Sequence, residues 1–288
     1  MQPVLTADQM RRCDEAAIRK CGIPGLLLME NAGRGLVEVV LHAYSPLDRK
    51  QILIFCGKGN NGGDGFAAAR LLSNHASKVT VLLLASPSEL RGDAQKNYKI
   101  LVKLSKTISI RRFSRKALQS VQTPDIIIDA MFGTGFSGIA RKPYSDCIEW
   151  INASGAEVVA VDIPSGINGT TGIAEGPAVH AHGTATFGSL KTGLLCNQGS
   201  EFSGRISVLD IGIPEQVISD PRHTIRLVKS EDVRNILPRR SLQANKYTTG
   251  KIFILAGSRG LTGAAALTSL AALRTGAGAV LLGTPDSV

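Results

Sequence analysis

Helical periodicity and short continuous apolar runs alternate along the first 215 residues of the chain. Two amphipathic stretches come first, at residues 6–20 and 26–43, and the first opens with the Thr6–Gln9 spacing of a helix capping box. The runs that follow predict strands at residues 51–56, 78–84, 125–129, 157–162, 183–187 and 205–209. Helical segments separate the first four strands, at residues 64–74, 87–104 and 144–153. Continuous apolar strands joined by helices indicate a mainly parallel sheet covered on both faces, which is a three-layer, Rossmann-like α/β sandwich.

The chain divides into three parts by this pattern. Residues 1–215 form the α/β domain, and residues 216–250 form a basic connector with a short helical candidate. Residues 251–288 then repeat a strand, a loop, a helix and a final strand. Two strands and one helix bury too little surface to offset the entropy of ordering them. The last part is therefore expected to be the truncated start of a second α/β domain.

Composition narrows the class of protein. The 288 residues are 43% hydrophobic, which suffices for a buried core, and the formal net charge is +10. The basic residues are dispersed and the chain has a single Trp, so nothing predicts a nucleic-acid surface. Five scattered cysteines without a C-x-x-C pair, no secretory signal and no membrane-spanning stretch predict a cytoplasmic protein. The sequence leaves a homo-oligomer open.

Three polar or glycine-rich loops follow predicted strands, at residues 57–65, 129–141 and 162–168. In an open parallel sheet, the carboxyl ends of the strands and the N-termini of the helices meet along one edge, where ligands bind. We therefore expect the three loops to form one site.

The first loop carries Gly57, Gly59 and Gly62 at the G-x-G-x-x-G spacing of a dinucleotide fingerprint. A dehydrogenase of that design also needs an acid about 20 residues further on to hold the ribose, and residues 82–86 contain none. A Walker A loop is excluded because Lys-Ser or Lys-Thr does not follow the spacing. What distinguishes the loop is the run Asn-Asn-Gly-Gly-Asp at residues 60–64, although a tight turn with incidental polar residues would also produce it.

The second and third loops each begin with an acid, Asp129 and Asp162, and Ser165 follows the latter. These side chains, with the amides of the first loop, are hard oxygen donors without Cys or His, so any bound metal would be an alkali or alkaline-earth cation. A turn carboxylate is the alternative for Asp129, and a solvated surface charge is the alternative for Lys191, which follows another predicted strand. No Ser-His-Asp or Cys-His arrangement is readable, which argues against nucleophilic catalysis.

Three motifs in order, GKGNNGGDGFAAARLL at residues 57–72, IIIDAMFGTGFSG at 126–138 and VDIPSGING at 161–169, resemble the YjeF N-terminal domain, the NAD(P)H-hydrate epimerase family. Residues 251–258, 263–266 and 271–278 resemble the opening of the ADP-dependent NAD(P)H-hydrate dehydratase domain, which has a ribokinase-like fold. The resemblance implies a bifunctional nicotinamide-nucleotide repair enzyme whose dehydratase half is incomplete.

The resemblance also implies the activity and the site. The family interconverts the R and S forms of NADHX and NADPHX, and the dehydratase, using ADP or ATP, returns the S form to NAD(P)H. It implies a potassium ion held by Asn61, Asp129 and Ser165. The implied substrate-binding residues are Asn60, Asn61, Gly62, Gly63, Asp64, Gly133, Thr134, Gly135, Phe136, Ser137, Gly138, Ile139 and Asp162.

Epimerisation by loss and re-addition of water at the hydrated ring carbon needs a positioned carboxyl group that gives and takes back a proton, and Asp162 is the candidate catalytic residue. Two other functions stay open at this point. An NAD(P)-dependent dehydrogenase is disfavoured by the missing ribose acid. A non-catalytic partner-binding scaffold of the same family is disfavoured because it would have no use for Asn60, Asn61, Asp64, Asp129 and Asp162 together.

Overall fold

The computed structural model describes residues 1–104, 108–121, 123–237 and 240–286. They form two compact units, Met1–Leu227 and Val228–Val288, which are described separately. Residues 238–239 of the expected connector and 287–288 of the expected second domain lie outside the described residues.

The first unit is built on a seven-stranded sheet in which every neighbouring pair of strands is parallel. Its strands are β2 (Gln51–Cys56), β3 (Lys78–Leu83), β4 (Ile108–Arg112), β5 (Ile126–Ala130), β6 (Glu157–Val161), β7 (Gly183–Phe187) and β9 (Arg205–Leu209). The spatial order is β4-β3-β2-β5-β6-β7-β9, so the direction of winding reverses between β2 and β5. The predicted parallel α/β sheet is confirmed, and it gains one edge strand, β4, that was not expected.

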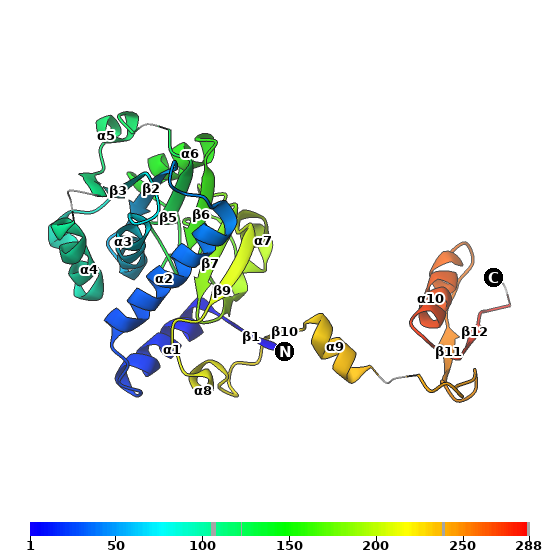
Figure 1. Ribbon diagram of the computed structural model, residues 1–288. Coiled ribbons are helices and arrows are strands. Elements are labelled where there is room, and N and C mark those ends of the chain that lie inside the picture. The colour runs from blue at the N-terminus through cyan, green and yellow to red at the C-terminus, as the bar shows by residue number, and fades with distance from the viewer. Residues whose placement is uncertain (105–107, 122, 238–239, 287–288) are drawn as a thin grey trace. The chain divides into compact units, whose positions relative to one another are not determined.

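Helices cover both faces of this sheet, as Figure 1 shows for α2 and α3 on one side. One core packs the strands against α1 (Ala7–Arg19), α2 (Gly25–Tyr44), α3 (Asn60–Leu72) and α4 (Gly92–Lys103). The other core packs them against α5 (Arg115–Gln119) and α6 (Tyr144–Ala153). Alternate residues of one strand enter opposite cores: Ile52 and Ile54 face the first, and Leu53 and Phe55 face the second. The three-layer prediction is thereby confirmed.

Two boundaries differ from the sequence expectation. The expected helix at 87–104 is a short helix, η1 (Pro87–Glu89), followed by α4, and α3 begins at Asn60 rather than at Asp64. The amides of residues 60 and 61 therefore belong to the first turn of a helix and not to a loop. The helix could not be read that far back because its first turn contains two glycines, which ordinarily disfavour helix.

A small second sheet joins the two ends of the first unit. Strand β1 (Gln2–Leu5) lies between β8 (Leu190–Lys191) and β10 (Arg226–Leu227). Three short helices complete the unit: η2 (Thr192–Leu194), α7 (Asn197–Phe202) and α8 (Glu215–Ile218). Because β10 pairs with β1, the compact unit continues to Leu227, past the expected domain boundary at 215. Pairing between residues so far apart along the chain leaves no local signal.

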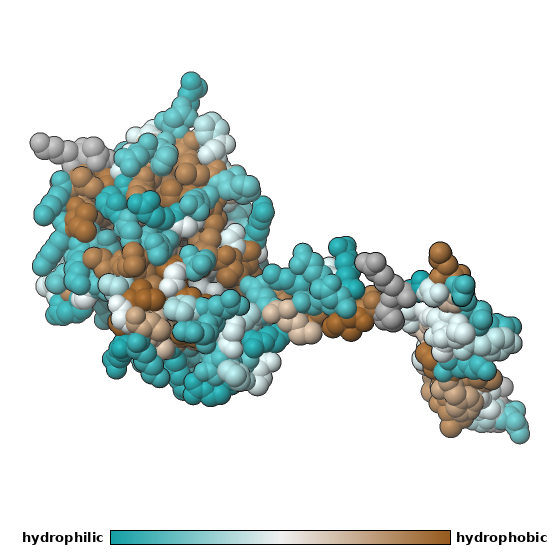
Figure 2. All heavy atoms as spheres, turned by 60° about the horizontal axis from the view of Figure 1, so that its bottom comes forward, coloured by the Kyte–Doolittle hydropathy of each residue, from teal (hydrophilic) through white to brown (hydrophobic). Residues whose placement is uncertain are grey.

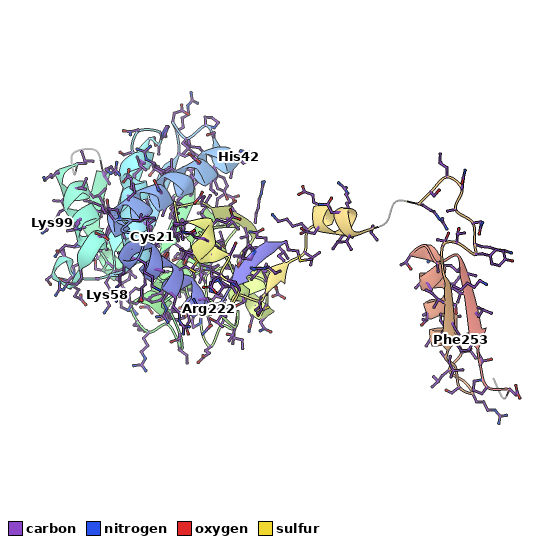
Figure 3. All side chains as sticks on the ribbon, turned by 90° about the horizontal axis from the view of Figure 1, so that it is seen from below. Cys21, His42, Lys58, Lys99, Arg222 and Phe253 are labelled. Carbon is purple, nitrogen blue, oxygen red and sulfur yellow. The ribbon has the colours of Figure 1, made fainter. Side chains whose placement is uncertain are left out.

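The second unit contains α9 (Ser230–Ile236), β11 (Lys251–Leu255), α10 (Gly263–Arg274) and β12 (Ala279–Gly283). Strands β11 and β12 are parallel and α10 connects them, as the sequence predicts for residues 251–288. Apolar side chains remain exposed on this unit, among them Phe253 (67%) and Leu255 (77%). Figure 2 shows hydrophobic surface on this unit, and Figure 3 labels Phe253. Two strands and a helix leave these side chains uncovered.

Two further expectations concern the whole chain. All five cysteines are free thiols, in agreement with their scattered spacing. Over the residues described, no helix is long and apolar enough to cross a membrane.

Candidate functional site

A cavity of about 880 Å³ opens beside the point where the strand order reverses. Its wall includes the loop after β2, the loop after β5 and the residue that follows β6. Residues from α1 and β8 contribute as well. This is the edge at which parallel α/β sheets bind ligands, and the volume lies in the upper part of the range of small-molecule sites.

The glycine loop is shaped by contacts that exclude a side chain. A Cβ on Gly57 would lie 2.1 Å from the carbonyl oxygen of Met131, and a Cβ on Gly62 would lie 2.1 Å from the carbonyl oxygen of Gly57. The loops after β2 and β5 therefore touch backbone to backbone. Helix α3 has no side-chain cap, and within the described residues the N–H groups of its first three residues, 60–62, have no hydrogen-bond partner. Free N–H groups at a helix N-terminus attract anions such as phosphate.

Asp129 and Ser165 lie beneath the cavity floor, and neither is exposed to solvent. The Ser165 hydroxyl donates to Asp129 Oδ1 at 2.6 Å, and the Ser165 N–H donates to Asp129 Oδ2 at 2.8 Å. The Ser165 hydroxyl also accepts from the N–H of Phe132 at 3.0 Å, while Asn61 donates to the Phe132 carbonyl at 2.7 Å. Burial raises the pKa of Asp129 to about 6, and the bonds from Ser165 limit that rise. Of the three expected cation ligands, Asn61 and Ser165 thus hydrogen-bond the backbone of Phe132, and Asp129 is held by Ser165.

Asp162 forms an ion pair with Lys191, a side chain that is only 1% exposed. Lys191 Nζ donates to Asp162 Oδ1 at 2.5 Å, to the Phe187 carbonyl at 2.6 Å and to the Thr186 hydroxyl at 3.0 Å. Lys191 is therefore no surface charge, which corrects that alternative. Asp162 has a backbone φ of +66°, a left-handed conformation costing about 1 kcal/mol that non-glycine residues adopt mainly at functional sites. In this strained conformation Asp162 lines the cavity.

Two more carboxyl groups line the same cavity without a salt-bridge partner. Asp64 is 8% exposed, and burial raises its pKa well above the usual value, helped by Asp162 and Asp14. Asp14 projects from α1, and burial raises its pKa to about 6, which Lys191 lowers and Asp162 raises. Among the described residues neither makes a hydrogen bond through its side chain. Six carboxyl groups thus line the cavity together with the one buried ammonium, that of Lys191; they belong to Asp14, Glu15, Asp64, Glu89, Asp93 and Asp162.

An aromatic cluster forms another part of the wall. The rings of Phe132 and Phe136 stack with centroids 4.6 Å apart, and Tyr144 lies 4.5 Å from Phe132. Flat aromatic surface beside polar groups is typical of sites that bind heterocyclic rings.

The structure gathers most of the predicted site residues around this cavity. Lining it directly are Asn60, Asn61, Asp64, Gly133, Thr134, Gly135, Phe136, Ser137 and Asp162. The other four predicted binding residues, Gly62, Gly63, Gly138 and Ile139, do not line it. Gly63 instead packs against Met29 and Ala94, and Ile139 is 57% exposed.

Sequence reasoning did not select Asp14, Lys58 or Tyr144, which also line the cavity (Lys58 is labelled in Figure 3). A signal for Asp14 existed: it lies one turn from Met10 and next to Cys13, on the margin of the buried stripe of α1. A carboxylate at such a margin is unusual for a purely structural helix.

A parallel sheet with a loop-lined cavity at its reversal point defines a Rossmann-like α/β protein with a ligand site. The chain belongs to the YjeF family, because the family model described as YjeF-related protein N-terminus matches residues 25–193. The matched range contains the three motifs and every predicted site residue. The family assignment made from those motifs is confirmed.

Similar proteins agree with this assignment. The chain is 40% identical to the bifunctional NAD(P)H-hydrate repair enzyme Nnr of Moorella thermoacetica over 289 residues, which cover 99% of this chain and 54% of that protein. It is 36% identical to the NAD(P)H-hydrate epimerase of Rhodopirellula baltica, over 75% of this chain and 87% of that one. The crystal structure of yeast ynu0, YNL200c, shares the fold, with a TM-score of 0.60 and 21% identity over 71% of this chain and 86% of that one. The chain spans about half the length of the bifunctional relatives it matches.

Proposed function

We propose that this protein is an NAD(P)H-hydrate epimerase that interconverts the R and S forms of NADHX and NADPHX. The observation that carries the proposal is the cavity itself, in which an uncapped helix N-terminus, aromatic surface and unpaired carboxyl groups come together in a member of this family. The free N–H groups of residues 60–62 suit a pyrophosphate, and the aromatic cluster suits a heterocyclic ring. The name of the Rhodopirellula relative supports the same reaction.

The reaction makes two demands on the protein. A group must give a proton to the departing hydroxyl and take one back from the returning water, and a negative charge must face the ring while it is cationic. The sequence assigned the first task to Asp162. Its ion pair with Lys191 suits the second task better, because a carboxylate held by a buried ammonium supplies charge at a fixed place.

A potassium ion fits the residues at Asn61, Asp129 and Ser165. All three offer amide, carboxylate or hydroxyl oxygens; Asn61 and Ser165 hydrogen-bond the backbone of Phe132, and Ser165 holds Asp129. Hard oxygen ligands of this kind suit an alkali cation rather than zinc. When bound, potassium would add positive charge beside the buried Asp129 and fix the loop after β5. Residues 133–137, which line the cavity, follow directly after Phe132 in the sequence.

Residues 251–288 are, in this proposal, the opening of the ADP-dependent dehydratase domain. Their parallel strand–helix–strand arrangement and uncovered apolar side chains support this, as does the alignment with the Moorella enzyme along 99% of the chain. A dinucleotide-dependent dehydrogenase has no comparable support, because residues 82–86 at the end of β3 contain no acid for the ribose.

The decisive assay couples the chain to a separate, S-specific dehydratase with ADP and a mixture of NADHX epimers. The separate enzyme alone stops when the S form is exhausted. Addition of this chain should carry the reaction to completion, and an Asp162→Asn variant that still binds NADHX should not. Full conversion without the separate enzyme would reveal a dehydratase instead, and an unchanged end point would refute the proposal.

A further inference from the structure

Asp14, Asp64 and Asp162 line the cavity beside one buried cation, the Lys191 ammonium, and that cation is already hydrogen-bonded. Lys191 donates to Asp162 at 2.5 Å, and the remaining donors of its ammonium go to the Phe187 carbonyl and the Thr186 hydroxyl. Asp162 also accepts from Thr186 and from the N–H of Phe187. Asp162 is thus fixed in place, whereas the carboxyl groups of Asp14 and Asp64 make no hydrogen bond or salt bridge among the described residues, although both line the cavity.

Asp14 and Asp64 differ in how they can hold a proton. Asp64 is 8% exposed within α3, and its pKa is raised well above the ordinary carboxyl value by burial and by the charges of Asp162 and Asp14. The pKa of Asp14 is raised by burial only to about 6, because Lys191 offsets part of the rise. A proton-transfer group works best when its pKa lies near the working pH, since it must both release and recover the proton.

We infer that Asp14 is a catalytic residue of the proposed epimerase, the carboxyl group that exchanges a proton with the hydrated ring carbon's hydroxyl. The inference rests on the proposed function. It assigns to α1, outside the range matched by the family model, a direct part in the chemistry. Asp162, paired with Lys191, remains the fixed charge that faces the ring.

The step balances without an oxidant or reductant. The Asp14 carboxyl gives its proton to the hydroxyl on the ring carbon, the carbon–oxygen bond breaks, and water leaves with the bonding pair while the ring nitrogen shares its electrons with the carbon. Water then adds to the opposite face, a new carbon–oxygen bond forms, and the added water returns a proton to Asp14 directly or through a second water. The cavity of about 880 Å³ has room for that water beside a bound ring.

The test compares Asp14→Asn with Asp48→Asn, a matched change at an exposed aspartate in the turn before β2. In the coupled NADHX assay, Asp14→Asn should lower kcat by about 100-fold or more, the usual worth of general acid–base catalysis, while Asp48→Asn stays at the wild-type rate. Binding of NADHX, measured by calorimetry, should change by less than about fivefold, because the loss is one of chemistry. Asp14→Glu keeps an acid and should recover part of the rate.

The pH profile separates proton transfer from a structural role. Asp14 shares the cavity wall with other charged groups: Arg11 and Glu15 on its own helix, and Lys58, Asp64, Glu89, Asp93, Asp162 and Lys191 from other elements. Because the protonated form donates, wild-type kcat should fall as pH rises above about 6. We call this fall of kcat the alkaline limb of the pH profile. Asp14→Asn should lack the alkaline limb, and Asp64→Asn should keep it whatever its rate.

Each outcome points one way. An Asp14→Asn enzyme with the wild-type rate and limb would overturn the inference and leave the proposed function standing. A slow Asp14→Asn enzyme that keeps the fall of kcat above pH 6 would also overturn the inference, because another group would then transfer the proton. A wild-type chain that fails to epimerise NADHX removes the function and the inference together.

Discussion

Lys191 Nζ lies 2.5 Å from Asp162 Oδ1, and both side chains are buried where β8 passes the end of β6. Lys191 is the buried lysine of the cavity wall, which it shares with the carboxyl groups of Asp14, Asp64 and Asp162. The ion pair links the small sheet β10-β1-β8, which contains Lys191, to the large sheet, where Asp162 follows β6. It also places a buried positive charge beside the carboxylate of Asp162 in the site.

Replacement of Lys191 by Met should destabilise the protein strongly. A buried Asp162 would lose its cation, and breaking such pairs costs roughly 3–5 kcal/mol. Urea unfolding followed by circular dichroism measures the change. Lys99→Met, at an exposed lysine of α4 labelled in Figure 3, should leave the free energy of unfolding unchanged, and an equal effect of the two variants would contradict the role of the pair.

Asp14→Asn should stabilise the fold at neutral pH while it removes activity. The pKa of Asp14 is about 6 in the folded protein against 3.8 in the reference state, so folding favours the protonated form. The stability of the wild type is therefore not reduced by Asp14 below pH 4, where the carboxyl group is protonated in both the folded and the unfolded state. It falls as pH rises to 6, and above pH 6 the folded wild type carries the full free-energy cost of a buried ionised carboxylate. Two pKa units correspond to an upper limit of about 3 kcal/mol, reduced by the partial exposure of the side chain.

The stability difference between Asp14→Asn and wild type should therefore be near zero at pH 4, grow up to pH 6 and stay level above it. Thermal unfolding across this range, with Asp48→Asn as the control, provides the measurement. A variant less stable than wild type at pH 7.5 would show that Asp14 holds the fold together instead of straining it.

The sequence predicted the layers and three of the loops for a definite reason. Runs such as Val-Val-Ala-Val at residues 158–161 are apolar at every position, as expected of a sheet covered on both faces, and each loop follows a largely apolar run directly. The parts of the site that it missed depend on contacts between distant segments. Lys191 lies in β8, which pairs with β1, and the charge of Asp14 reaches Asp64 only once α1 has packed into the same core as α3. Local patterns carry no record of such pairings.

Gly62 and Gly59 offer a matched test of the glycine loop. A Cβ at Gly62 would lie 2.1 Å from the Gly57 carbonyl oxygen, while a Cβ at Gly59 meets no atom within 4 Å. Gly62→Ala should therefore cost about 1–3 kcal/mol of stability through steric overlap, and Gly59→Ala less than about 1 kcal/mol as an altered helix cap. Urea unfolding gives both values. Gly62→Ala should also weaken NADHX binding more than Gly59→Ala does, because it displaces the N–H groups at the start of α3. If Gly59→Ala has the larger effects, the backbone contact at Gly62 is not the reason that these positions are glycine.

Potassium should stabilise the wild-type protein through the residues around Phe132. An ion that binds the folded state alone raises the unfolding temperature with its concentration, and Asp129 supplies a buried carboxylate that potassium would neutralise. The unfolding temperature should thus be higher in potassium chloride than in choline chloride at equal ionic strength, which cancels general screening. Ser165→Ala removes both an oxygen donor and the hydroxyl that links Asp129 to the Phe132 N–H, so it should abolish the difference between the two salts. Ser200→Ala, at an exposed serine of α7, should preserve that difference. If Ser165→Ala responds to potassium as the wild type does, the ion binds elsewhere and the Asp129–Ser165 bond serves only to anchor the loop after β5.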